Sequence, residues 1–158
     1  MAAMRTMHQW LDEYGASHRN ATNELIHWIC VPTIALTVVG FLWAIPVPAS
    51  FAATSPWLNW ATIGVALWIT YYFLLSPSLG IGATLCLAAM LFIVRWMDTL
   101  PWPLWATSLA IFVVAWIGQF IGHQIEGTRP SFFKDVQFLL IGPIWLVSHV
   151  YRRLGVTY

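Results

Sequence analysis

The sequence predicts an all-α integral membrane protein, a polytopic helical bundle of about four transmembrane helices followed by a C-terminal re-entrant or interfacial helix. Two observations lead to this class. Hydrophobic residues make up 59% of the 158 residues and charged residues only 8%, and the mean hydropathy of +0.72 is far above that of an ordinary soluble domain. Apolar runs of about 20 residues, long enough to cross a bilayer as helices, recur along the chain. We expect residues 1–158 to form a single membrane domain, because no linker, repeat or low-complexity tract divides them.

The predicted membrane-spanning segments are separated by proline-containing or polar breaks. Pro46 and Pro48 end the first segment, the "SPSLG" sequence ends the second, and Asp98 with "LPWP" ends the third. The four segments cover residues 26–45, 57–75, 79–97 and 103–122.

A fifth apolar run, residues 136–151, is shorter and contains Gly142 and Pro143, which favours a re-entrant or interfacial helix over a full span. Tryptophans near the ends of the predicted spans support their boundaries, because the amphipathic indole ring favours the headgroup layer. These tryptophans are Trp57, Trp60, Trp96, Trp102 and Trp105.

The distribution of charge predicts the orientation in the membrane. Six of the seven Lys and Arg residues lie before the first predicted span or after the fourth, and only Arg95 lies elsewhere. Both termini should therefore face the cytoplasm. The polar N-terminal segment lacks a signal-peptide pattern, and this compact chain is expected in a bacterial inner membrane. Seven scattered cations form no basic stripe, so we expect no nucleic-acid partner. Cys30 and Cys86 lie in apolar runs and are expected to pack as small hydrophobic residues.

Charged and titratable residues, which are rare in this chain, are concentrated in the stretch "GQFIGHQIEGTRPSFFKD", residues 118–135, at the end of the fourth span and directly after it. The topology places this stretch at the cytoplasmic face, together with the start of the first span. Four of the five histidines should meet there, and the remote His8 is expected on the solvated surface. The four are His18, His27, His123 and His149.

Each of these histidines has a functional and a structural explanation. His27 lies in the first turn of an apolar helix, where an ionisable group is costly unless it reaches the interface, pairs or binds a ligand. His123 and Glu126 share one helix face, which suits a metal site with a carboxylate or a local hydrogen bond at a helix terminus. His18 and His149, taken singly, suit surface or interfacial positions. Together the imidazoles suit iron, zinc or copper, and their spacing identifies no particular metal.

Two sequences resemble a known family. "HRNATNELIHWICVPTI" near the start, and "GHQIEGTRPSFFKDVQFLLIGPIWLVSHV" near the end, resemble the membrane proteins typified by the fungal 2-hydroxy fatty acid dioxygenase. The likeness extends over nearly the whole chain. It implies an iron(II)-dependent enzyme that uses dioxygen to shorten 2-hydroxy fatty acids by one carbon, in α-oxidation.

The resemblance also implies roles for individual residues. His18, His27 and His123 match the proposed iron ligands, and Asn23 would support a ligand or the start of the first helix. Glu126 stands one residue nearer to the histidine than the acid of the family does. At position 149 many members have an acid where this chain has a histidine, so His149 is a candidate fourth ligand.

A substrate with a carboxylate and an alkyl chain would need a cation at the membrane surface. Arg129 or Lys134 could hold the carboxylate, although both also suit the ordinary enrichment of cations on the cytoplasmic side. A zinc-dependent lipid hydrolase would use the same histidines, and a small transport or assembly protein is a further alternative. The transport alternative is weakened because the second and third spans contain no charged residue except Arg95.

Overall fold

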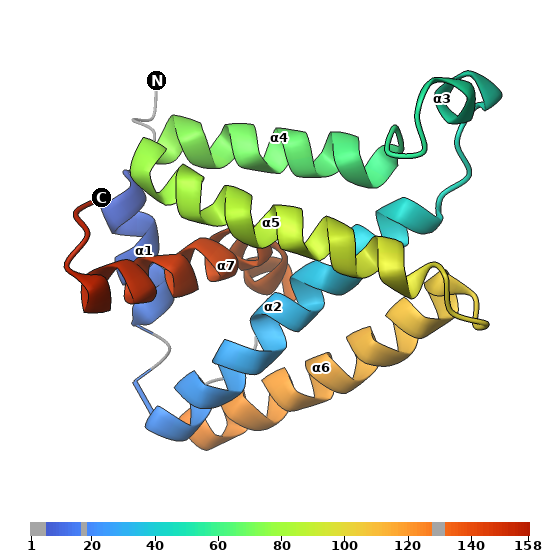
Figure 1. Ribbon diagram of the computed structural model, residues 1–158. Coiled ribbons are helices and arrows are strands. Elements are labelled where there is room, and N and C mark those ends of the chain that lie inside the picture. Colours follow the sequence, from blue (N-terminus) through green and yellow to red (C-terminus); the bar gives the residue numbers. More distant parts are fainter. Residues whose placement is uncertain (1–5, 17–18, 128–131) are drawn as a thin grey trace.

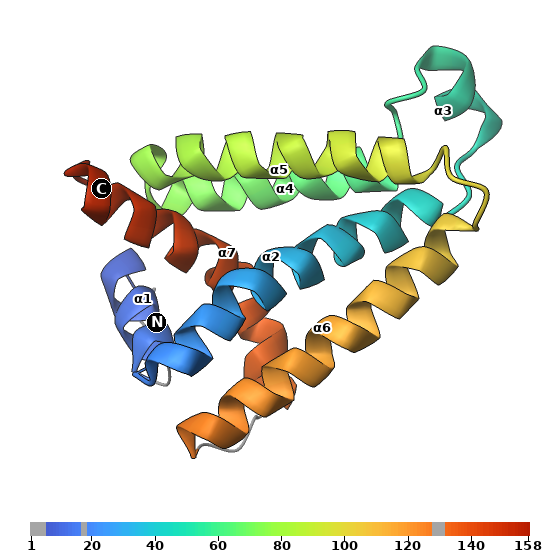
Figure 2. The same cartoon turned by 60° about the horizontal axis from the view of Figure 1, so that its bottom comes forward.

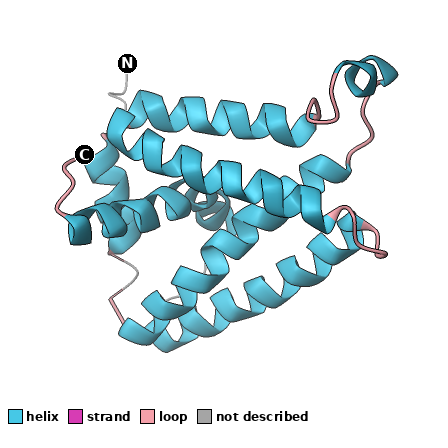
Figure 3. Ribbon diagram, viewed as in Figure 1, coloured by secondary structure: helices cyan, strands magenta, loops and turns pink. Residues whose placement is uncertain are grey.

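The computed structural model describes residues 6–16, 19–127 and 132–158, with side chains described throughout these ranges except at 132–139. Within these ranges the chain forms α-helices and no β-strand (Figure 3), which confirms the predicted all-α class. The helices are α1 (Met7–Gly15), α2 (Ala21–Ala44), α3 (Ala49–Thr54), α4 (Trp60–Leu75), α5 (Pro77–Met97), α6 (Leu104–Glu126) and α7 (Phe132–Leu154).

The long helices match the predicted spans. α2, α5 and α6 are long and apolar enough to cross a membrane, and the 16-residue α4 is a shorter apolar helix. Large apolar side chains cover their outer surfaces; Leu74, Leu85 and Val114 are 81%, 71% and 69% exposed. An exposed apolar surface of this extent is suited to lipid rather than water. The chain is therefore a polytopic membrane protein, with three helices of full spanning length and one shorter helix at the predicted second segment.

α2 begins five residues before the predicted span because a polar cap starts it. The side chain of Asn20 accepts hydrogen bonds from the backbone N–H groups of Thr22 and Asn23, at 2.9 and 3.4 Å. Such a cap satisfies donors that the first helical turn leaves without a partner. The helix then continues through Pro32 and ends at Ala44, directly before the predicted proline break.

Single residues mark the ends of α4 and α6. Ser76 ends α4, and its side chain also accepts a hydrogen bond from Leu79 N at the start of α5, where Pro77 occupies the first helical position. At the other end of the chain Gly127 stops α6 with a φ of 76°, a left-handed conformation that glycine adopts without strain.

α2 and α6 run antiparallel and lie side by side (Figures 1 and 2). Glycines permit the close approach. A Cβ atom at Gly122 would meet the side chain of Asn23, and one at Gly118 would lie 2.7 Å from the Sγ atom of Cys30. Small residues four positions apart commonly allow helices to approach closely in a membrane. The Gly118–Gly122 spacing therefore brings the start of α2 against the end of α6.

α7 is a continuous helix that passes through Gly142 and Pro143, so these residues interrupt the apolar run but not the helix. Two tyrosine hydroxyl groups tie it to the rest of the bundle. Tyr72 of α4 donates to the carbonyl of Leu140 at 2.5 Å, and Tyr151 of α7 donates to the carbonyl of Ser78 at 3.0 Å. The helix packs against α1, α2 and α5.

The short helix α1 was not predicted from the sequence. Thr6 and Gln9 form a capping box, in which each side chain bonds to the backbone N–H of the other residue. Met7, Leu11 and Tyr14 lie one turn apart on one face and are buried, and the helix packs on α7. His8 is exposed, as expected, and its ring stacks on that of Tyr158.

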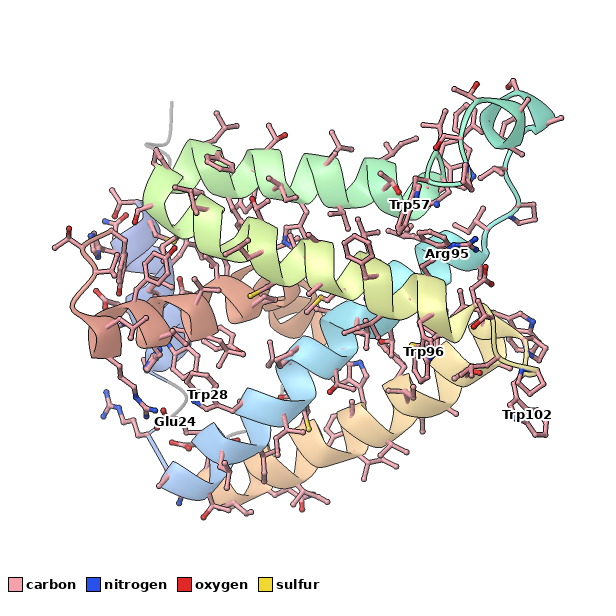
Figure 4. The ribbon with its side chains drawn as sticks, viewed as in Figure 1. Glu24, Trp28, Trp57, Arg95, Trp96 and Trp102 are labelled. Carbon is pink, nitrogen blue, oxygen red and sulfur yellow. The ribbon has the colours of Figure 1, made fainter. Side chains whose placement is uncertain are left out.

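Tryptophans gather at one end of the bundle. Figure 4 shows Trp57, Trp96 and Trp102 near Arg95, at the end opposite to Glu24 and Trp28. All five tryptophans expected at span ends are exposed, and Trp102 reaches 72%. The Nε1 atom of Trp43 donates to Asp98 at 3.1 Å at this same end. This arrangement is typical of an aromatic belt at a membrane interface.

Candidate functional site

The start of α2 and the end of α6 bring two predicted site residues together, His27 and His123. Their ring centroids lie 5.1 Å apart, and the ring planes meet at 87°. The two side chains are only 2% and 8% exposed. A pair of imidazoles from opposite ends of the chain is therefore buried at one end of the bundle.

A backbone carbonyl fixes the tautomer of His27. The Nδ1 atom of His27 lies 2.9 Å from the carbonyl oxygen of Asn23, one turn earlier on α2. Because a carbonyl oxygen can only accept a hydrogen bond, this contact assigns a proton to Nδ1, so that in the neutral ring Nε2 is the nitrogen with the lone pair. Metal-binding histidines typically hold one ring nitrogen in this way and coordinate through the other.

Glu126 joins the two helices beside the histidine pair. Its Oε1 atom accepts a hydrogen bond from the backbone N–H of Arg19 at 3.0 Å. Its Oε2 atom accepts from the backbone N–H of Asn20 at 2.9 Å and from the side-chain amide of Asn23 at 3.0 Å. An anion at the N-terminal end of a helix is stabilised by the helix dipole. We refer to these contacts between Glu126 and residues 19, 20 and 23 as the Glu126 clasp.

The clasp and the histidine pair form two successive contacts between α2 and α6. Asn23 precedes His27 by one turn, and Glu126 follows His123 by one turn. The Glu126 carboxylate thus links the end of α6, which carries His123, to the start of α2, which carries His27. Asn23 takes part twice, because its carbonyl orients His27 while its amide binds Glu126.

His149 lies on α7 in different surroundings. Its Nδ1 atom is 3.0 Å from the carbonyl oxygen of Trp145, and its ring lies 4.0 Å from the Trp145 ring, with the ring planes inclined at 52°. The ring of Trp28 lies 6.3 Å away, and the guanidinium group of Arg153 lies over that ring at 5.9 Å. The ring contacts found for His149 are thus with Trp145 of its own helix and with Trp28 of α2.

Three predicted site residues cannot be placed through their side chains. His18 and Arg129 lie outside the described residues, and Lys134 lies in α7 with its side chain outside the described set. Within the part of the chain that the structure describes, no group of three or more His, Cys, Asp or Glu side chains could hold a metal. Of the predicted metal ligands, the structure describes His27, His123 and His149, and it brings the rings of His27 and His123 together.

Sequence reasoning missed one polar residue of the site. Gln119 lies on α6 four residues before His123, on the same helix face, and is 6% exposed. It was overlooked because it stands inside an apolar run. Its helical spacing from His123 was the available signal.

An apolar groove of about 490 Å³ also runs between α2 and α6, lined by residues such as Ile29, Thr33 and Val114. Neither His27 nor His123 lines this groove. Cys30 and Cys86 are both free, as expected.

The fold and the site define a polytopic helical membrane protein with a buried histidine pair where its first and last long apolar helices meet. The chain belongs to the Mpo1-like family: the sequence model of that family, described as "2-hydroxy-palmitic acid dioxygenase Mpo1-like", matches residues 4–154. This confirms the resemblance found in the sequence. The 2-hydroxy-palmitic acid dioxygenase MPO1 of Saccharomyces cerevisiae is 30% identical over 144 residues, which cover 90% of this chain and 78% of the yeast protein. No solved structure matches.

Proposed function

We propose that the protein is an iron(II)-dependent dioxygenase that acts on 2-hydroxy fatty acids and shortens them by one carbon. The family and the name of the yeast relative support the substrate class and the type of reaction. The observation that carries the proposal is the buried contact between His27 and His123. Ionisable groups buried within membrane helices are costly and commonly serve a function.

The donor chemistry of the pair fits a metal such as iron. Neutral imidazole is a common ligand of iron, zinc and copper, and the Nδ1 contact of His27 directs its Nε2 atom toward that role. We propose His18 as a third ligand, because it belongs to the segment that leads into α2, and His149 as the candidate fourth. Iron, when bound, would supply the activation of dioxygen.

The protein itself would bind and orient the substrate. A 2-hydroxy fatty acid carries a carboxylate and a hydroxyl group at one end, and its alkyl chain is compatible with lipid. We propose that Arg129 or Lys134 holds the carboxylate at the membrane surface, where a charge-assisted hydrogen bond is strong. The Glu126 clasp would keep His27 and His123 at a fixed separation while the substrate enters and leaves.

We further propose that both termini face the cytoplasm, in the inner membrane of a bacterium. Arg19 belongs to the clasp, and the guanidinium group of Arg153 lies over the ring of Trp28, which Figure 4 shows at the end opposite to Arg95. Single cysteines placed near residue 8 and near residue 100 in a cysteine-free variant would test the orientation. The first should resist a membrane-impermeant thiol reagent in intact cells, and the second should react.

Metal content and oxygen dependence test the function together. The wild-type protein, purified anaerobically in detergent, should retain iron when iron(II) and zinc compete. The His27→Ala and His123→Ala variants should lose it, and His8→Ala, at an exposed position, is the matched control. Turnover of a 2-hydroxy fatty acid to the acid with one carbon fewer should require dioxygen and should stop in both site variants.

Two outcomes would contradict the proposed function. Zinc retention with oxygen-independent cleavage of a lipid would support the hydrolase alternative. Turnover that is unaffected by the loss of both histidines would remove the proposed site altogether.

A further inference from the structure

Gln119 places a neutral amide next to the histidine pair, inside a membrane-spanning helix. The residue lies one turn, about 6 Å along the axis, from His123 toward the middle of α6. Its side chain is 94% buried, since 6% of it is exposed. Because residues four positions apart share a helix face, the amide and the imidazole of His123 point to the same side of α6.

No hydrogen bond found among the described residues gives the Gln119 amide a role in holding the helices together. Among the described residues, no hydrogen bond to its oxygen or nitrogen is found, whereas the polar side chains of Thr37, Ser148 and Asn23 each bond to a neighbour. The oxygen and nitrogen of this amide are not among the fully enclosed side-chain atoms that lack a partner, so a ligand can reach them. Polar residues that link membrane helices do so by bonding across the contact, and Gln119 makes no such bond to a described residue.

We infer that Gln119 binds the 2-hydroxyl group of the substrate and thereby sets the preference for 2-hydroxy over unsubstituted fatty acids. This inference rests on the proposed function. A hydroxyl group donates one hydrogen bond and accepts others, and a carboxamide has both an acceptor oxygen and donor N–H groups. A carboxylate only accepts and is better held by a cation, which leaves the hydroxyl as the group that suits the amide.

The position of Gln119 agrees with the chemistry of the head group. The carbon that carries the hydroxyl follows the carboxyl carbon, so it lies on the side of the alkyl chain. Gln119 lies deeper along α6 than His123, in the direction in which an alkyl chain would extend from the polar end of the helix. A site that hydrogen-bonds a substrate hydroxyl discriminates strongly against the analogue that lacks it.

Equilibrium binding without turnover tests this role. The iron(II)-loaded protein, kept anaerobic in detergent, is given radiolabelled 2-hydroxypalmitate with unlabelled 2-hydroxypalmitate or palmitate as competitor. The wild type should prefer the hydroxy acid. Gln119→Met, which keeps the length of the side chain and removes the amide, should reduce that preference roughly tenfold, the effect of one lost hydrogen bond to a buried group. Gln124→Met, at an exposed position of the same helix, is the matched control.

The outcomes separate this inference from the proposed function. A Gln119→Met protein that retains iron and the full preference of the wild type would overturn the role of Gln119 alone. A wild-type protein with no preference for the hydroxy acid would overturn the proposed substrate as well. Should Gln119→Met fail to insert, Gln119→Leu removes the same amide, and the same loss of preference is expected.

Discussion

The side-chain amide of Asn23 donates a hydrogen bond of 3.0 Å to Glu126, a residue 103 positions further along the chain. The carboxylate also accepts the backbone N–H groups of Arg19 and Asn20, so the end of α6 is fastened to the start of α2. His27 and His123 stand one turn from this bond on their respective helices. The geometry of the histidine pair therefore depends on a contact in which neither histidine takes part.

The Glu126 clasp should contribute measurably to stability. Glu126→Ala leaves a part-buried amide and two backbone donors without their acceptor, and we expect a loss of roughly 1–3 kcal/mol of unfolding free energy. Asn23→Ala should lose less, because the backbone bonds to Glu126 remain. Thermal unfolding in detergent of both variants and of the double variant forms a cycle that isolates the direct bond. Additive effects in this cycle would contradict a direct bond between the two side chains.

Gly122 should tolerate no larger side chain. A Cβ atom there would meet the side chain of Asn23 and lie 3.4 Å from Cγ2 of Ile26. Gly122→Ala should therefore push α2 away from α6 and cost roughly 1–3 kcal/mol, a typical effect of overpacking. We also expect weaker metal retention, because the histidine separation would grow. Gln124→Ala, at an exposed position on the same helix, should change neither property.

Removal of the N-terminal cap of α2 should reduce the free energy of unfolding less than removal of Glu126 does. Asn20→Ala removes the acceptor for the backbone N–H groups of Thr22 and Asn23 but keeps its own backbone N–H, which donates to Glu126. The expected loss is about 1 kcal/mol, with no change in iron content. Asn20→Asp, which keeps an acceptor and adds favourable charge at the helix start, should restore the stability. A large loss of iron in Asn20→Ala would mean that the cap shapes the site directly.

His149 offers a test of the fourth ligand. Its ring contacts Trp145 and Trp28, and its Nδ1 atom is bound to the carbonyl of Trp145. As the candidate fourth ligand, His149 should be needed for full iron retention, so we expect His149→Phe to preserve the aromatic contacts and to lower the iron content. Metal analysis of His149→Phe and His27→Ala side by side decides the matter. Unchanged iron content in His149→Phe would instead remove this histidine from the set of ligands.

The sequence predicted the long helices well, because apolar runs bounded by proline and polar residues report both length and ends. It also predicted that His27 and His123 meet, since the topology returns the end of the fourth span to the side on which the first begins. The start of α2 was placed five residues late because hydropathy does not register a polar cap. Asn20 has a side chain that suits an N-terminal cap, and its position gives the observed start.

Other features depend on contacts that hydropathy does not encode. α1 has a capping box and buried residues at helical spacing, Met7, Leu11 and Tyr14, within a segment that is polar on average. The partners of Glu126 are two backbone N–H groups and the side-chain amide of Asn23, all near the other end of the chain, and no local pattern predicts them. Gln119 was hidden by its apolar neighbours, although its spacing from His123 was visible in the sequence.

Because His27 and His123 lie in α2 and α6, the proposed site can form only after most of the chain has been synthesised. During insertion α2 enters the membrane early, whereas His123 is added only after the intervening hydrophobic helices. A nascent or prematurely terminated chain would have the first imidazole without the second and would lack Glu126 to fasten α2. Partial chains that lack α6 should therefore not act on substrate. The proposed reaction with dioxygen would begin only after α6 has been inserted beside α2.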